Sequence, residues 1–94
     1  MRLERVFERF DPFRHIYRFV YGDTELVCMP DAPRVVCRVR RGGRRLRGVL
    51  VLTLFDLMRI LPERIDRVEV ARLGEDMSKR VVWACRDVRN PLKR

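Results

Sequence analysis

Six arginine residues lie close to the glycine pair Gly42-Gly43 and offer the clearest chemistry in the sequence. A guanidinium group stays positively charged, and its planar set of N–H donors matches the oxygens of a phosphate. Residues 34–41 and 44–52 favour β-strands, and two glycines suit the two-residue turn of a hairpin. We therefore predict an arginine-rich hairpin that binds an anionic, phosphate-bearing partner. Its candidate binding residues are Arg38, Arg40, Arg41, Arg44, Arg45 and Arg47.

The turn sets the register of this hairpin, and the register separates its two faces. The predicted cross-strand pairs are Arg41–Arg44, Arg40–Arg45, Val39–Leu46, Arg38–Arg47 and Cys37–Gly48. Side chains alternate between the faces of a strand. One predicted face is a core face with Val35, Cys37, Val39, Leu46, Leu50 and Leu52. The other holds Arg38, Arg40, Arg45 and Arg47, with Val36, Val49 and Val51 further from the turn.

Arginines that face each other across two strands imply a ligand. Like charges directly opposite destabilise a sheet by a few tenths to about 1 kcal/mol per pair, and a bound anion would relieve that repulsion. Two structural readings compete with this one. Edge strands carry basic residues that block aggregation, and acidic side chains from elsewhere could fold over the hairpin. Those acids are Glu63, Asp66, Glu69, Glu75 and Asp76.

Aromatic side chains are the second class of candidate, because single-stranded nucleic acid is held by basic groups together with rings on which bases stack. Phe19 and Tyr21 are the stacking candidates if residues 15–21 are extended. Phe55 lies off the apolar face of its predicted helix, and Trp83 alternates with apolar neighbours, which favours the core. We expect core or dimer packing for Phe7, Phe10, Phe13 and Tyr17.

The charge balance narrows the class of partner. The 94-residue chain has 22 basic and 13 acidic residues, a net charge of +9, and an isoelectric point near 10.9. Such an excess points to a nucleic acid, an anionic membrane surface or an acidic protein. All the basic residues except Lys79 and Lys93 are arginines, a bias that a GC-rich genome or adaptation to heat also produces.

No catalytic arrangement is evident, and the sequence predicts neither an enzyme nor a cofactor. It has no Gly-x-Ser-x-Gly and no phosphate-binding Gly-rich loop ending in Gly-Lys. His15 is the single histidine, and the acidic residues are spread along the chain. The predicted helix over 53–61 carries only Arg59 outward, so base-specific readout of a duplex is not expected.

Three cysteines, Cys28, Cys37 and Cys85, lack the spacing of a metal site, and no zinc or other metal site is predicted. We expect them to be small buried apolar residues. A disulfide remains open if the source is a hyperthermophile.

The elements that would position these residues form one α+β domain over 1–94. Apolar spacing of three and four predicts helices over 2–10 and 12–21, with a strand over 15–21 as the alternative. Strands are expected over 24–29, 34–41, 44–52, 65–73 and 79–87, with turns at 30–33 and 74–76 and a helix over 53–61 capped by Thr53. The predicted fold is N-terminal helices followed by an antiparallel sheet of about five strands with one inserted helix.

A membrane location is not expected. The sequence has no apolar run of about 18 residues, and the N-terminal residues Met1 to Arg5 lack an apolar signal core. We expect a cytoplasmic protein.

In layout the chain resembles the small archaeal single-stranded DNA-binding proteins of the ThermoDBP-related group. The resemblance rests on the arginine hairpin over 34–52, the helix over 54–61 directly after it, and the arginine-dominated composition. It covers most of the chain as architecture and involves no sequence motif. It implies an archaeal, thermophilic source and a basic cleft with an apolar floor for bases, and it assigns no individual residue.

These observations predict a non-catalytic nucleic-acid-binding protein whose favoured ligand is single-stranded DNA or RNA. The alternative is a protein-interaction or assembly module whose basic face docks an acidic protein partner. In that reading, the apolar N-terminal stripe at heptad-like spacing would form a homodimer interface.

Overall fold

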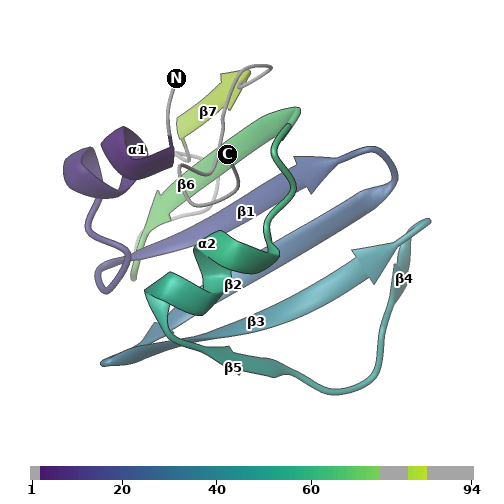
Figure 1. The fold of residues 1–94 in the computed structure, drawn as a ribbon, viewed down its shortest axis with the longest axis horizontal. Coiled ribbons are helices and arrows are strands. Elements are labelled where there is room, and N and C mark those ends of the chain that lie inside the picture. The colour runs from purple at the N-terminus through teal and green to yellow at the C-terminus, as the bar shows by residue number, and fades with distance from the viewer. Residues whose placement is uncertain (1–2, 75–80, 85–94) are drawn as a thin grey trace.

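The computed structural model describes residues 3–74 and 81–84. Helix α1 (Leu3–Arg9) comes first, followed by strands β1 (His15–Tyr21), β2 (Thr24–Asp31) and β3 (Arg34–Arg41). The chain continues through β4 (Arg44–Arg45), β5 (Leu50–Leu52), helix α2 (Leu54–Ile60), β6 (Arg67–Arg72) and β7 (Val81–Ala84) (Figure 1).

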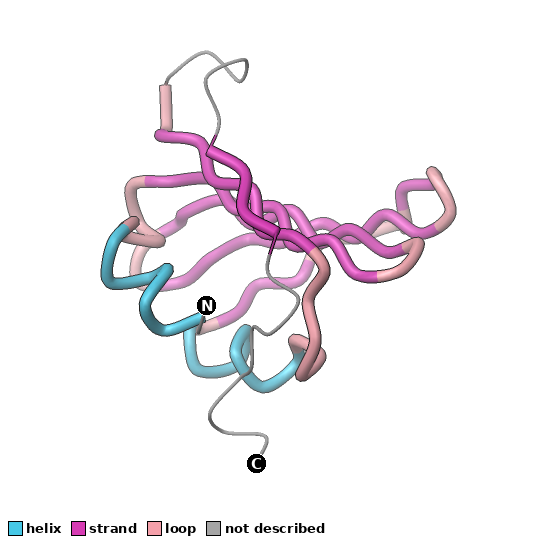
Figure 2. Tube along the Cα trace, turned by 90° about the horizontal axis from the view of Figure 1, so that it is seen from above, coloured by secondary structure: helices cyan, strands magenta, loops and turns pink. Residues whose placement is uncertain are grey.

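The described strands form one antiparallel sheet in the order β4-β3-β2-β1-β6-β7, and β5 pairs with β3 on the same side as β4. Both helices lie on one side of this sheet, and the end of the sheet that carries β4 extends beyond them (Figures 1 and 2). The predicted α+β class, antiparallel sheet and inserted helix are therefore confirmed. We call the sheet face that carries neither described helix the open face.

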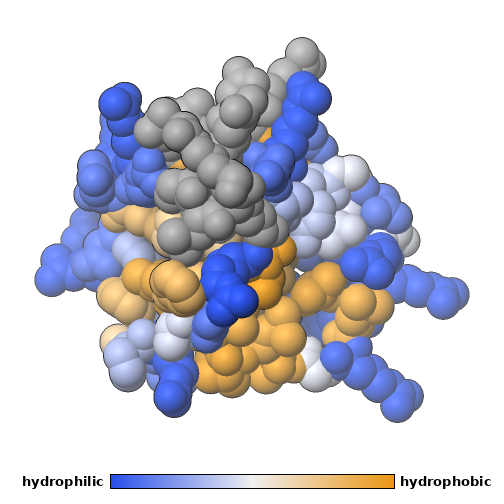
Figure 3. Space-filling model, in the orientation of Figure 1, coloured by the Kyte–Doolittle hydropathy of each residue, from blue (hydrophilic) through white to orange (hydrophobic). Residues whose placement is uncertain are grey.

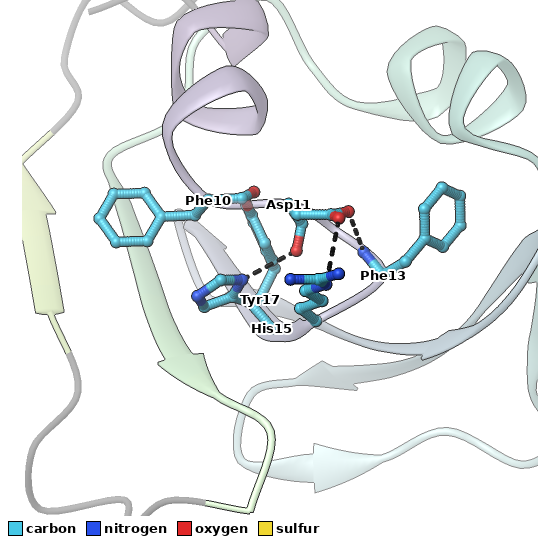
Figure 4. A network of polar contacts seen from close by, with 6 residues as sticks. Phe10, Asp11, Phe13, His15 and Tyr17 are labelled. Atoms are coloured by element: carbon cyan, nitrogen blue, oxygen red, sulfur yellow. Dashed lines mark hydrogen bonds and ion pairs between the residues drawn. The ribbon is translucent and has the colours of Figure 1, made fainter.

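The predicted second helix over 12–21 is wrong, and the alternative strand is correct. Asp11 closes a turn instead, because its carboxylate accepts a hydrogen bond from Phe13 N at 2.9 Å (Figure 4). Its carbonyl also accepts a hydrogen bond from Arg14 N at 2.9 Å. The following residues alternate between faces, with Tyr17 and Phe19 buried. Pairing with both β2 and β6 outweighs the helical spacing, because β1 lies in the middle of the sheet.

The core fills the space between the sheet and the two helices. Strands β1, β2, β3 and β6 supply one face each, while Leu3 and Val6 come from α1 and Leu57 from α2. The Tyr17 hydroxyl donates to the carbonyls of Phe10 and Val6, and burial raises the pKa of Tyr17. The aromatic residues predicted to pack into a core do so: Phe7, Phe10 and Phe13 lie against it and Tyr17 lies within it.

Helix α2 confirms its predicted start. The Thr53 hydroxyl accepts a hydrogen bond from Asp56 N at 3.1 Å, as a capping residue does. Leu57 faces the core, whereas Phe55 is 57% exposed. The two described helices have seven residues each, too few to cross a membrane.

The C-terminal predictions are tested only in part. Strand β6 is slightly shorter than the predicted strand over 65–73, and β7 falls within the predicted strand over 79–87. The remaining residues of that strand, the turn residues 75–76 and the side chains of Trp83 and Cys85 lie outside what the structure describes.

Candidate nucleic-acid interface

The arginine hairpin forms as predicted at its turn. Gly42 and Gly43 have φ angles of 59° and 79°, the left-handed conformation that a two-residue hairpin turn requires at both positions. Arg41 pairs with Arg44 and Arg40 with Arg45, and Leu46 N donates to the Val39 carbonyl at 2.9 Å.

Beyond Leu46 the predicted register is wrong. The ladder is interrupted over residues 47–49 and resumes with Cys37 opposite Leu50, two positions later than predicted. Gly48 has a φ angle of 81°, so it permits the chain to leave the ladder there. Because the shift is even, Leu50 and Leu52 keep their predicted face.

The six hairpin arginines are all exposed, and they divide between two faces. Alternation along β3 places Arg38 and Arg40 on the open face, and Arg45 lies opposite Arg40. Arg41 and Arg44 point to the helix-bearing side. Arg47 does not face Arg38 as predicted, but lies in the interrupted segment beside Leu46 and Leu50. The hairpin therefore presents basic groups on both of its faces.

In the competing reading, acidic residues from elsewhere fold over the arginines, and those within the described part of the chain form no ion pair with them. Glu69 is buried and forms an ion pair with Arg18, with 3.2 Å between Oε2 and the guanidinium. The Asp66 carboxylate accepts a hydrogen bond from Gly22 N at 2.8 Å. Glu63 is exposed, and Glu75 and Asp76 lie outside the described residues.

Among residues 3–74 and 81–84, no ion pair involves a hairpin arginine. Arg41 Nε donates to the Thr24 hydroxyl at 3.4 Å, and Glu25 is the cross-strand neighbour of Arg40. Positive charge is therefore concentrated at this end of the sheet. In Figure 3 long hydrophilic side chains extend from the side on which Figure 1 shows β4.

A shallow depression of about 220 Å³ lies between β3 and the interrupted segment. Leu46 and Leu50, predicted to be core residues, are instead 43% and 41% exposed there, because the sheet extends beyond the helices at this end. The lining residues are Cys37, Val39, Leu46, Arg47, Gly48, Val49 and Leu50. We call this site the depression; it combines apolar surface with the Arg47 side chain.

The open face carries its own apolar row next to arginine. Met29, Val36 and Val51 are successive cross-strand neighbours on β2, β3 and β5. Met29 is 46% exposed and Val51 is 56% exposed. Arg38 follows two positions after Val36 on the same face, so apolar and basic groups adjoin on this side too.

The two predicted stacking residues, Phe19 and Tyr21, differ in how deeply they are buried. Phe19 is fully buried in the core and cannot stack on a base, so that prediction is wrong. Tyr21 is half-buried at the end of β1, in a row with Thr24 and Arg41. Burial raises the pKa of Tyr21, and the Arg41 charge acts in the opposite direction. Of the two, only Tyr21 lies where a ligand of the arginines could reach it.

Sequence reasoning missed the depression and the exposure of its leucines. The signal was Gly48, an isolated glycine within an apolar strand pattern, which marks a bulge or an interruption of pairing. Comparison with protein-family models, curated proteins and solved structures found no match to this chain.

Proposed function

We propose that this protein binds nucleic acid without catalysis, and that its favoured ligand is single-stranded DNA or RNA. The observation that carries the proposal is the set of six exposed arginines at one end of the sheet, none in an ion pair with a described residue. Arginine binds phosphate oxygens in a bidentate manner. A nucleic-acid backbone supplies such groups at regular intervals.

The preference for single strands rests on the apolar groups beside the arginines. Apolar side chains are exposed in the depression, next to Arg47, and in the row of Met29, Val36 and Val51, next to Arg38. Unpaired bases have free faces that can cover such surface, whereas the faces of bases in a duplex are stacked on each other. The resemblance in layout to the archaeal ThermoDBP-related proteins points to the same class of ligand, and we propose a cytoplasmic location as well.

Fluorescence anisotropy with labelled single-stranded DNA, duplex DNA and single-stranded RNA tests the proposal. We expect binding that weakens steeply as salt rises, because each phosphate contact releases counterions. Single strands should bind more tightly than the duplex. Absence of binding to all three at low salt would refute a nucleic-acid function, and tighter binding of the duplex would refute the single-strand preference.

An acidic protein partner is the second candidate. The observation in its favour is the exposed apolar surface at the sheet edge, where Val49 and Val51 are 45% and 56% exposed. The N-terminal apolar residues do not offer a homodimer interface, because Leu3, Val6 and Tyr17 pack in this chain's own core. A pull-down with the wild-type protein and a variant lacking the hairpin charges would identify such a partner if no nucleic acid binds.

A further inference from the structure

Two cysteines face each other inside the sheet, outside the proposed nucleic-acid site. Cys28 on β2 and Cys37 on β3 are direct cross-strand partners. Both thiols are free, and the two residues are 3% and 0% exposed on the core face. Their side chains therefore point the same way from adjacent positions.

The hydrogen-bond pattern gives the type of this pair. Gly42 N donates to the Asp23 carbonyl at 3.0 Å, so Asp23 and Gly42 form a hydrogen-bonded pair at the end of the β2–β3 ladder. Hydrogen-bonded and non-hydrogen-bonded pairs alternate along antiparallel strands. Counting along the ladder, Cys28 and Cys37 form a non-hydrogen-bonded pair, for which the Cα atoms lie about 4.5 Å apart. That separation is within the range that a disulfide spans.

We propose that Cys28 and Cys37 are a modification site that closes to a cross-strand disulfide when the protein meets a small-molecule disulfide. The Cys37 thiol loses its proton and attacks one sulfur of the oxidant, which releases one thiolate and leaves a mixed disulfide. Cys28 then loses its proton during a brief opening, and its thiolate attacks the Cys37 sulfur, forms the Cys28–Cys37 bond and expels the second thiolate; the two released thiolates take up the two protons. Two protein thiols are oxidised, and one small disulfide is reduced to two thiols.

Its position favours Cys37 as the first nucleophile, although its side chain is fully buried until the sheet edge opens locally. Its outer neighbour in the sheet is Leu50, the first residue of β5 after the interruption at residues 47–49, and Cys37 is one of the residues that line the depression. The basic surroundings, with Arg38 next in the chain and Arg47 at the depression, attract an anionic oxidant such as oxidised glutathione. Burial raises the pKa of Cys28 and keeps its thiol protonated, so closure is slow and proceeds through brief openings.

Formation of this disulfide would link β2 to β3, the strand that carries Arg38, Arg40 and Arg41. The disulfide encloses only residues 28–37, and restricting this loop in the unfolded chain stabilises the folded state. The inference stands apart from the proposed nucleic-acid function, since it depends only on the pairing of β2 with β3.

Peptide mapping of the wild-type protein tests the proposal. The three cysteines lie in different tryptic peptides, residues 19–34, 35–38 and 81–86. After incubation with oxidised glutathione and non-reducing digestion, we expect peptides 19–34 and 35–38 to be linked. The midpoint of thermal unfolding should rise by about 10 °C, and it should return when the protein is reduced.

The control variant is Cys37→Ala, which should give neither the linked peptide nor the rise in midpoint. The proposal is overturned if oxidation yields only glutathione adducts, or if it links residues 81–86 to either of the other peptides. A linked product whose unfolding midpoint is below that of the reduced protein would also overturn the stabilising role.

Discussion

The salt dependence of binding to a single strand measures how many hairpin arginines contact phosphates. For single strands, the logarithm of the binding constant falls with the logarithm of salt concentration with a slope of about −0.7 per neutralised phosphate. Six contacts give a slope of about −4, or a loss of roughly 300-fold in affinity between 50 and 200 mM salt. The structure supplies six exposed arginines for those contacts.

Two triple substitutions separate the faces of the hairpin. The open-face variant changes Arg38, Arg40 and Arg45 to Gln, and the other changes Arg41, Arg44 and Arg47 to Gln. Each variant loses half of the hairpin charge, and its salt slope should be about −2. Its affinity for the single strand should then fall roughly 20-fold between 50 and 200 mM salt. The arginines are exposed, so thermal unfolding should stay close to that of the wild type.

A matched control removes the same charge elsewhere. Arg5 on α1 and Arg67 and Arg72 on β6 are exposed, and their replacement by Gln lowers the net charge equally. Anisotropy titrations at four salt concentrations should show the wild-type slope for this control. The reasoning is refuted if the control and the hairpin variants lose the same slope, because binding would then depend only on net charge.

Three further predictions concern the depression, the helix cap and a buried hydroxyl. Replacing Leu46 and Leu50 together by Ser should weaken single-strand binding roughly tenfold and duplex binding less, measured by the same anisotropy assay; equal losses for both ligands would argue against bases in the depression. Thr53→Ala should lower the free energy of unfolding by about 1 kcal/mol in urea titrations, since Asp56 N loses its acceptor. Burial raises the pKa of Tyr17 above the ordinary 10.0, so the folded state holds the proton more tightly. The contribution of Tyr17 to the free energy of unfolding should be fully present below pH 10 and be lost as pH rises above it. The Tyr17→Phe variant should be about 1 kcal/mol less stable at neutral pH, but its free energy of unfolding should decrease less steeply above pH 10.

The turn of the hairpin and the start of α2 could be predicted because single residues determine them. Gly42-Gly43 supplies the positive φ angles of the turn, and Thr53 supplies a capping oxygen. Both effects act over a few residues, so tertiary structure has little opportunity to override them.

Longer-range competition explains the errors. Residues 12–21 satisfy both the helical and the strand spacing, and pairing with two neighbouring strands decided in favour of β1. Phe19 then falls on the core face, which removed it as a stacking residue. The isolated Gly48 indicated an interruption of the strand, but not by how many residues the pairing would shift. The exposure of Leu46 and Leu50 depends on how far the helices extend over the sheet, which no local pattern shows.

The most direct test of the central claim is a titration of ¹⁵N-labelled protein with a short single-stranded oligonucleotide, followed by amide chemical shifts. We expect the changes to concentrate in residues 36–51, with smaller changes at Tyr21. Shifts confined to α1 and β6, or no shifts at low salt, would contradict the assignment of the arginine hairpin as a nucleic-acid interface.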